Sequence, residues 1–159
     1  MDFRLLGPLE VVDNDRPVAL GGGRQRVLLA VLLLHANEVV STDRLLDELW
    51  GQRPPPTAGK IVQVYVSRLR KQLGHDRLVT RSPGYALRVD RSELDLDRFE
   101  RLVAEAGTAD APSAASTLRR ALALWHGPPL ADLAYEPFAQ AEIARLCLLY
   151  TSPSPRDRS

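Results

Sequence analysis

The segment from residue 57 to residue 91 constrains the fold more than any other part of the sequence. It begins with TAGKIVQVYVSRLRKQLG, a helix-length stretch in which apolar residues recur at helical spacing and which closes at Gly74. It continues with LVTRSPGYALRV, two strand-length runs around Ser82-Pro83-Gly84. Glycine commonly ends a helix, and Ser, Pro and Gly favour turns. The segment therefore predicts a helix over 57–73 followed directly by a β-hairpin.

The residues before this segment predict a small sheet and two more helices. The opening FRLLGPLEVVDNDRPVAL consists of short strand-length runs separated by turn residues, which indicates a small antiparallel sheet. Gly21–Gly23 then form a turn before a helix from about Arg24 to Ala36, which is almost wholly apolar and therefore buried. Ser41 or Thr42 caps a second helix, which stops at Gly51. The predicted fold class is α+β: a winged helix-turn-helix with an N-terminal antiparallel sheet, three helices and a C-terminal hairpin wing.

The pattern changes to all-helical near residue 91, and the charge balance changes with it. Residues 1–91 contain 14 Lys/Arg against 10 Asp/Glu, whereas residues 92–146 contain 5 against 9. LDLDRFERLVAEA and SAASTLRRALALWHG predict paired helices, and PFAQAEIARL begins another. Such helix pairs are tetratricopeptide-like. We expect two domains, residues 1–91 and a truncated helical domain over 92–146, and we expect residues 147–159, rich in Ser, Pro and Arg, to be a non-native or disordered tail.

Composition narrows the classes of function. The N-terminus lacks the pattern of a secretory signal, and the longest apolar run, Val27–Leu34, is too short to span a membrane, so we expect a cytoplasmic protein with no membrane partner. One cysteine and three scattered histidines indicate no metal site. The Gly21–Gly23 turn lacks the Gly-Lys-Ser/Thr of a phosphate loop. Asp95 and Asp97 lie at a helix start, where acids stabilise the helix dipole without any chemistry. We therefore expect neither a cofactor nor an enzyme.

The basic helix over 57–73 is the candidate functional element. It contains no acidic residue. Apolar spacing predicts that Ala58, Ile61, Tyr65, Leu69 and Leu73 pack inward. The residues predicted to face outward are Lys60, Gln63, Val64, Ser67, Arg68 and Lys71. In a DNA major groove, Arg suits guanine, Gln suits adenine, Val can contact a thymine methyl, and Lys neutralises phosphate.

The context of this helix favours a DNA-reading role. Two helices precede it and a glycine-bearing hairpin follows it, as in a helix-turn-helix with a wing, where this helix enters the groove. Arg24 and Arg26, at the start of the first long helix, are candidates for contact with the DNA backbone. The alternative is a solvated basic helix in a helical protein-interaction adaptor, which would bind an acidic protein surface and show no preference among DNA sequences.

The run VQVYVSRLRKQLG followed by RLVTRSPGYAL resembles the recognition helix and wing of OmpR/PhoB-type DNA-binding domains. With FRLLGPLEV before it and LDRFERLVAEA, ALALWHGPPLADL and EPFAQAEIARL after it, the chain to about Leu146 resembles the Streptomyces antibiotic regulatory protein (SARP) family. Members are transcriptional activators with a winged helix and a bacterial transcriptional activation domain.

This resemblance implies binding of double-stranded DNA at direct repeats near promoters, by two protomers in tandem that contact RNA polymerase in the nucleoid. Pro54–Pro56 match the loop used for polymerase contact, and Arg81 and Tyr85 match the wing. The recognition-helix positions that match are Lys60, Val64, Ser67, Arg68 and Arg70.

Overall fold

The computed structural model describes residues 1–21, 23–127, 130–133, 136 and 139–145. These residues form two compact units, each described by itself below. The first unit consists of Met1 and Glu10–Asp90, and the second consists of Asp2–Leu9 together with the described residues from Arg91 onward. The predicted tail over 147–159 lies outside the described residues.

The first unit begins with a tight hairpin. Strand β2 (Glu10–Asp13) pairs antiparallel with β3 (Arg16–Pro17), with Asp13 opposite Arg16. The two turn residues, Asn14 and Asp15, both have positive φ, at 50° and 64°. Two-residue hairpins favour this left-handed backbone because its twist matches that of the strands, and Asn and Asp tolerate it. The polar turn predicted at this point is therefore confirmed.

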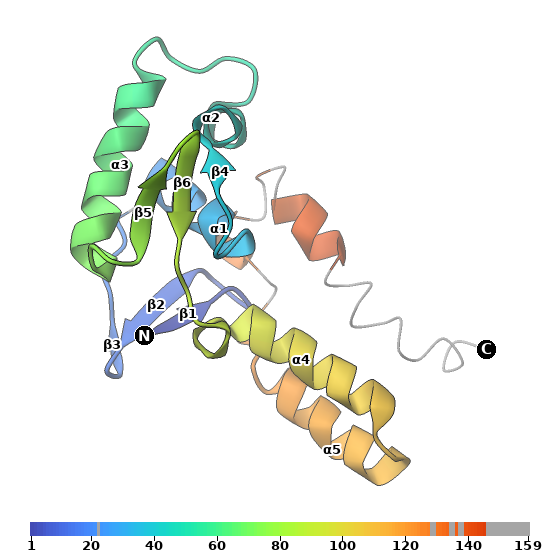
Figure 1. Ribbon diagram of the computed structural model, residues 1–159. Coiled ribbons are helices and arrows are strands. Elements are labelled where there is room, and N and C mark those ends of the chain that lie inside the picture. The colour runs from blue at the N-terminus through green and yellow to red at the C-terminus, as the bar shows by residue number, and fades with distance from the viewer. Residues whose placement is uncertain (22, 128–129, 134–135, 137–138, 146–159) are drawn as a thin grey trace. The chain divides into compact units, whose positions relative to one another are not determined.

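Three helices form the body of the first unit: α1 (Arg24–Leu34), α2 (Thr42–Trp50) and α3 (Ala58–Leu73) (Figure 1). Every residue of α1 from Val27 to Leu33 is buried, which explains its continuous apolar run. Helix α2 begins as predicted, because the Ser41 hydroxyl oxygen accepts a hydrogen bond of 3.1 Å from the Arg44 backbone N–H. The helices pack on one another and surround the core of the unit.

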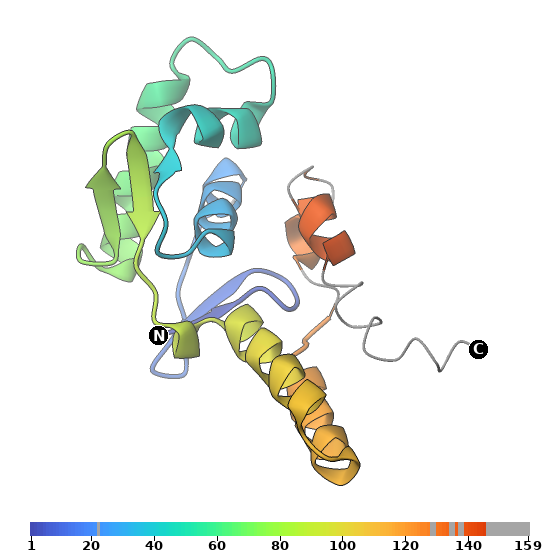
Figure 2. The ribbon, with the colours of Figure 1, turned by 45° about the vertical axis from the view of Figure 1, so that its right-hand side comes forward.

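The wing is a three-stranded antiparallel sheet of order β4-β6-β5. Strands β5 (Leu78–Arg81) and β6 (Gly84–Leu87) form the predicted hairpin, and the sequence did not predict the third strand, β4 (Val40–Ser41). The hairpin runs alongside α3, as Figures 1 and 2 show. Three helices followed by this hairpin confirm the α+β winged helix-turn-helix class.

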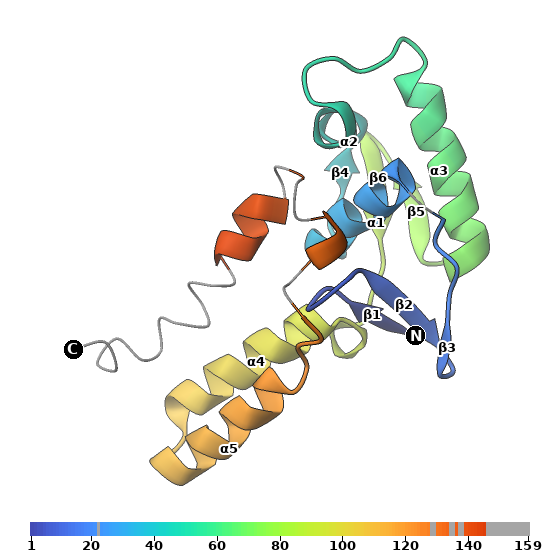
Figure 3. The same ribbon diagram turned by 180° about the vertical axis from the view of Figure 1, so that it is seen from behind.

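The second unit is mainly helical. Helix α4 (Asp95–Thr108) follows a short 3-10 turn, η1 (Arg91–Glu93), and packs along α5 (Ala111–Leu122) as a helical hairpin (Figures 1 and 3). A second 3-10 turn, η2 (Ala131–Leu133), follows, and residues 139–145 are helical. The two helical runs expected from the sequence leave residues 107–112 between them, but α4 continues to Thr108, and Asp110 already caps α5 by accepting a hydrogen bond of 2.9 Å from Ser113 N–H. The predicted tetratricopeptide-like helical class agrees with this arrangement.

The N-terminal strand β1 (Asp2–Arg4) belongs to this second unit. Phe3, fully buried, forms a parallel bridge with Leu94. The Leu6 carbonyl accepts from His126 N–H at 2.6 Å, and the Leu9 N–H donates to Asp132 Oδ1 at 2.9 Å. The prediction grouped all residues before 91 together, whereas these long-range contacts join residues 2–9 to the helical part of the chain.

Candidate nucleic-acid interface

Helix α3 presents one polar, basic face to solvent. Its buried residues are Ala58, Val62, Val66, Leu69 and Leu73. The exposed side chains on the opposite face are Lys60, Gln63, Val64, Ser67, Arg68 and Lys71. Because residues three and four apart share a helix face, these side chains form a continuous strip. Val64 is 46% exposed and adds an apolar side chain to this otherwise polar strip.

The inward set of the predicted helix was partly wrong. Ile61 and Tyr65 are only half-buried, and Val62 and Val66 take the fully buried positions instead. Helix α3 contacts α1 and α2 as well as β5, so its buried arc spans more than one neighbour. The outward set is unaffected by this shift. We call this outward set of six residues, from Lys60 to Lys71, the basic strip.

The strip has no acidic neighbour on its own helix. Within α3 the charged residues are Lys60, Arg68, Arg70 and Lys71, all cationic. Arg70 and Lys71 also lie in the last turn, where cations interact favourably with the helix dipole. A surface with cationic, amide, hydroxyl and methyl groups on one rigid helix has the donors and apolar contacts that base edges and phosphates require.

Arg70 differs from its neighbours because its guanidinium contacts the wing. Its Nε donates a hydrogen bond of 2.8 Å to the Leu78 carbonyl, and its Nη2 donates one of 2.6 Å to Thr80 Oγ1. The side chain is half-buried. The pattern of charges in the sequence does not distinguish Arg70 from Arg68. The difference depends on contacts with β5, which lies beyond the end of α3 and is brought to Arg70 only by the fold.

The turn of the wing is held close to the start of α2. The Pro83 carbonyl accepts from both the backbone N–H and the hydroxyl of Thr42, each at 3.2 Å. Gly84 lies opposite Ser41 in the sheet, and a Cβ at Gly84 would stand 1.9 Å from the Val40 carbonyl oxygen. Only glycine allows the two strands to approach this closely.

Of the wing residues predicted to contact DNA, Arg81 is exposed at the end of β5, and Tyr85 is half-buried on β6. The structure therefore places Arg81 at the tip of the hairpin. Tyr85 lies opposite both Val40 and Thr80 in the sheet. These two residues belong to the wing and not to the basic strip.

A second connection ties α1 to the far end of α3. Gln25, which is 3% exposed, donates from Nε2 to the Leu20 carbonyl at 2.9 Å and to Gln72 Oε1 at 3.2 Å. Arg24, the first residue of α1, therefore lies near the C-terminal end of α3. Lys60, twelve positions before Gln72, is about 18 Å further along the helix axis. The residues predicted to contact DNA, from Lys60 at one end of α3 to Arg24 near the other, are therefore spread along the whole helix.

Asn37 joins the end of α1 to the base of the wing and was not singled out from the sequence. Its φ is 67°, and its backbone N–H donates to the Leu87 carbonyl at 2.8 Å. Its side chain exchanges two hydrogen bonds with the backbone of Val89, at 2.8 and 2.9 Å. Asn is common in left-handed turns, so the sequence could indicate a turn at this position. It could not indicate the hydrogen-bond partners of Asn37, which lie some fifty residues later.

Two family models match the chain in succession. Residues 15–87 match the C-terminal domain of transcriptional regulatory proteins, and residues 94–151 match the bacterial transcriptional activator domain. The chain is 41% identical over 149 residues to the regulatory protein AfsR of Streptomyces coelicolor, a match that covers 91% of this chain and 15% of AfsR. The chain belongs to the SARP family.

Other SARP-family relatives agree. The regulatory protein DnrI of Streptomyces peucetius is 33% identical over 161 residues, which cover 92% of this chain and 59% of DnrI. The solved structure of Mycobacterium tuberculosis EmbR in complex with a low affinity phosphopeptide matches with a TM-score of 0.87 and 34% identity, over 94% of this chain and 42% of EmbR. This SARP-family chain therefore spans between about a seventh and three fifths of its relatives.

The SARP family consists of transcriptional regulators, a class that is generally not enzymatic. Among the described residues, no helix is long and apolar enough to cross a membrane, and no group of three His, Cys, Asp or Glu side chains could hold a metal ion.

Proposed function

We propose that the first unit binds duplex DNA sequence-specifically, with α3 in the major groove and the wing on the neighbouring backbone or minor groove. The observation that carries this proposal is the basic strip: six exposed side chains on one helix, without an acid, beside a hairpin whose tip is exposed. The fold and the family are those of DNA-reading regulators.

Within this proposal the residues of the basic strip divide by chemistry. Arg68 and Gln63 suit bidentate contacts with guanine and adenine, and Val64 suits a thymine methyl. Lys60, Ser67 and Lys71 suit phosphate contacts, which set affinity more than specificity. Outside the strip, Arg81 and Tyr85 contact DNA from the wing. Arg24 approaches the backbone beside the C-terminal end of α3.

The second unit supports a role in activation. A bacterial transcriptional activator domain follows the DNA-reading unit in the same chain. We assign it contacts with the transcription machinery, and we assign the exposed residues around Pro54 and Pro56 to RNA polymerase. Two protomers on direct repeats near a promoter, in the cytoplasm at the nucleoid, complete the proposal. In this proposal DNA binding belongs to the unit before residue 91 and activation to the helical unit, which includes Asp2–Leu9.

Selection from a randomised duplex pool tests this function. The best selected site and a scrambled site are then compared by fluorescence anisotropy across a salt series. We expect enrichment of a repeated motif and a specificity ratio of at least about 10³. Weak, salt-sensitive binding with no enriched motif would instead support the adaptor alternative, in which the basic strip binds an acidic protein surface.

A further inference from the structure

Two hydrogen bonds from Arg70 to strand β5, here called the tether, join α3 to the wing at an outer edge of the sheet. Because β5 is an outer strand of the β4-β6-β5 sheet, one row of its backbone groups faces away from β6. The Arg77 carbonyl accepts a hydrogen bond of 2.6 Å from Arg88 N–H and therefore faces the neighbouring strand of the hairpin. Successive carbonyls of a strand point in opposite directions. The Leu78 carbonyl therefore faces away from that strand, and Arg70 Nε donates to it at 2.8 Å.

The second bond of the tether reaches the residue beside the wing tip. Arg70 Nη2 donates to Thr80 Oγ1 at 2.6 Å, and Thr80 directly precedes Arg81. Thr80 is also opposite Tyr85 in the hairpin. The two wing residues proposed to contact DNA, Arg81 and Tyr85, are therefore both neighbours of Thr80, the residue that Arg70 contacts. Because the guanidinium is planar and its donors are fixed in a fork, two bonds to one strand define the strand's position against the helix.

We infer that Arg70 is a positioning residue, which holds the wing at a fixed spacing from the basic strip so that Arg81 and Arg68 engage one duplex together. This inference rests on the proposed DNA-binding function. It differs from the role that the family resemblance implies for Arg70, which is direct contact with DNA. A positioning residue affects affinity through Arg81, so loss of its partner on the wing should have the same effect, whereas a direct DNA contact would be lost only when Arg70 itself is replaced.

Three substitutions separate these roles, all measured with the full chain on the selected duplex. Thr80→Val keeps the shape of the side chain and removes the acceptor, and Thr80→Ser keeps the hydroxyl as the matched control. Arg70→Ala removes the donor. We expect Thr80→Val and Arg70→Ala each to weaken specific binding by at least about threefold, with base preference unchanged and Thr80→Ser close to the wild type.

Two double-mutant cycles give readouts that a merely structural role would not move. Thr80→Val should add little in the Arg70→Ala background, because the two residues share one bond. Arg81→Ala should cost less binding in the Thr80→Val background than in the wild type, because an unheld wing no longer presents Arg81 to the duplex. Circular dichroism spectra that match the wild type identify the variants that remain folded, and the exposed Thr80 provides a variant that removes no buried group.

Several results would overturn the inference. Additive effects in either cycle would show that Arg70, Thr80 and Arg81 act independently. A salt slope for Arg70→Ala that falls by about 0.9 more than the slope for Thr80→Val would show that the charge of Arg70 itself contacts a phosphate. Failure of the underlying function is distinguishable, because the wild-type chain would then show no preference between the selected and the scrambled duplex before any variant was made.

Discussion

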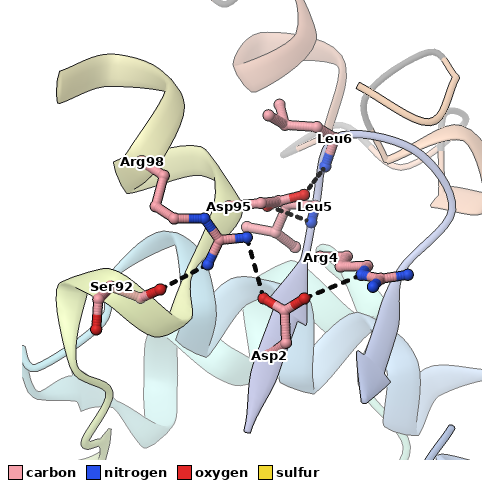
Figure 4. A network of polar contacts seen from close by, with 7 residues as sticks. All are labelled: Asp2, Arg4, Leu5, Leu6, Ser92, Asp95 and Arg98. Atoms are coloured by element: carbon pink, nitrogen blue, oxygen red, sulfur yellow. Dashed lines mark hydrogen bonds and ion pairs between the residues drawn. The ribbon is translucent and has the colours of Figure 1, made fainter. Parts of the chain in front are cut away.

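The carboxylate of Asp95 accepts a hydrogen bond of 2.8 Å from the backbone N–H of Leu5, ninety residues earlier in the chain. Its other oxygen accepts from Leu6 N–H at 3.1 Å, and Asp95 is 1% exposed (Figure 4). Next to it, Arg98 donates to Asp2 at 3.1 Å and to the Ser92 carbonyl at 2.6 Å. This network joins the N-terminal strand to the first turn of α4, and it makes residues 2–9 a structural part of the helical unit.

Replacement of Asp95 by Asn should destabilise the second unit. An amide offers one acceptor oxygen, so one buried N–H of Leu5 or Leu6 would face an NH₂ group and lose its partner. The expected cost is about 1–3 kcal/mol. Amide hydrogen exchange at Leu5 and Leu6, together with urea unfolding, measures it. Glu105→Gln, at an exposed position of the same helix, is the control, and equal stability of the two variants would contradict this account.

Asp95 should also contribute to the pH dependence of stability. Burial raises the pKa of its carboxyl above the ordinary 3.8, against the opposing effects of the Leu5 and Leu6 N–H groups and Arg98. As the pH falls through the raised pKa, the native state takes up the proton before the unfolded state does, so this group's contribution to stability increases until about pH 3.8 and is constant below it. Carbon NMR titration of Asp95 should show a midpoint above 3.8. A midpoint at or below 3.8 would refute the dominance of burial.

Arg68→Ala should change which DNA sequence is preferred. As a bidentate partner of guanine, Arg68 is expected to supply about 1–3 kcal/mol on the selected site, and its loss should relax base choice at one position. Selection repeated with the variant measures both effects. Arg119→Ala removes an exposed arginine from α5 in the second unit and should leave the selected motif unchanged. An equal loss of affinity for every sequence would remove Arg68 from base reading.

Lys71→Ala should behave differently from Arg68→Ala although the two residues share one helix face. A phosphate contact carries no base information, so binding to selected and scrambled duplexes should weaken alike, and the salt slope should fall by about 1. Anisotropy titrations over the salt series measure the slope. An unchanged slope would place Lys71 away from the phosphates.

Local signals explain why helix ends were predictable. Ser41 caps α2, and glycines at 51 and 74 follow α2 and α3, all as their positions in the sequence indicate. The buried stripe of α3 was less predictable, because Ile61 and Val62 are adjacent apolar residues, as are Tyr65 and Val66. Stripes built from either member of each pair have regular helical spacing. Only packing against neighbouring elements decides which members are buried.

The remaining differences depend on partners distant in the sequence. An acid at a helix start predicts dipole stabilisation, and nothing near Asp95 indicates that Leu5 and Leu6 will meet it. Strand β4 has two residues and exists through its pairing with β6, some forty positions later. The candidate interface could be predicted because its signal, an acid-free face, lies within one helix, whereas the tether of Arg70 could not.

A pair of glycine substitutions tests the close approach of β4 and β6. Gly84→Ala would place its Cβ 1.9 Å from the Val40 carbonyl oxygen, a backbone atom that cannot move without separating the strands. Displacement of β4 would also disturb the contacts of Thr42 with Pro83, so we expect a loss of more than about 3 kcal/mol in the stability of the first unit. Urea unfolding followed by circular dichroism measures the loss.

Gly59→Ala is the matched control, because Gly59 is exposed in the first turn of α3 and its added Cβ would meet nothing within 4 Å. Alanine restricts the unfolded chain and favours the helix, so this variant should gain about 0.5–1 kcal/mol. The two changes are chemically identical and have opposite expected signs. If Gly84→Ala were as stable as the wild type, the strands would have to be further apart than the structure shows, and the wing would not be anchored by β4.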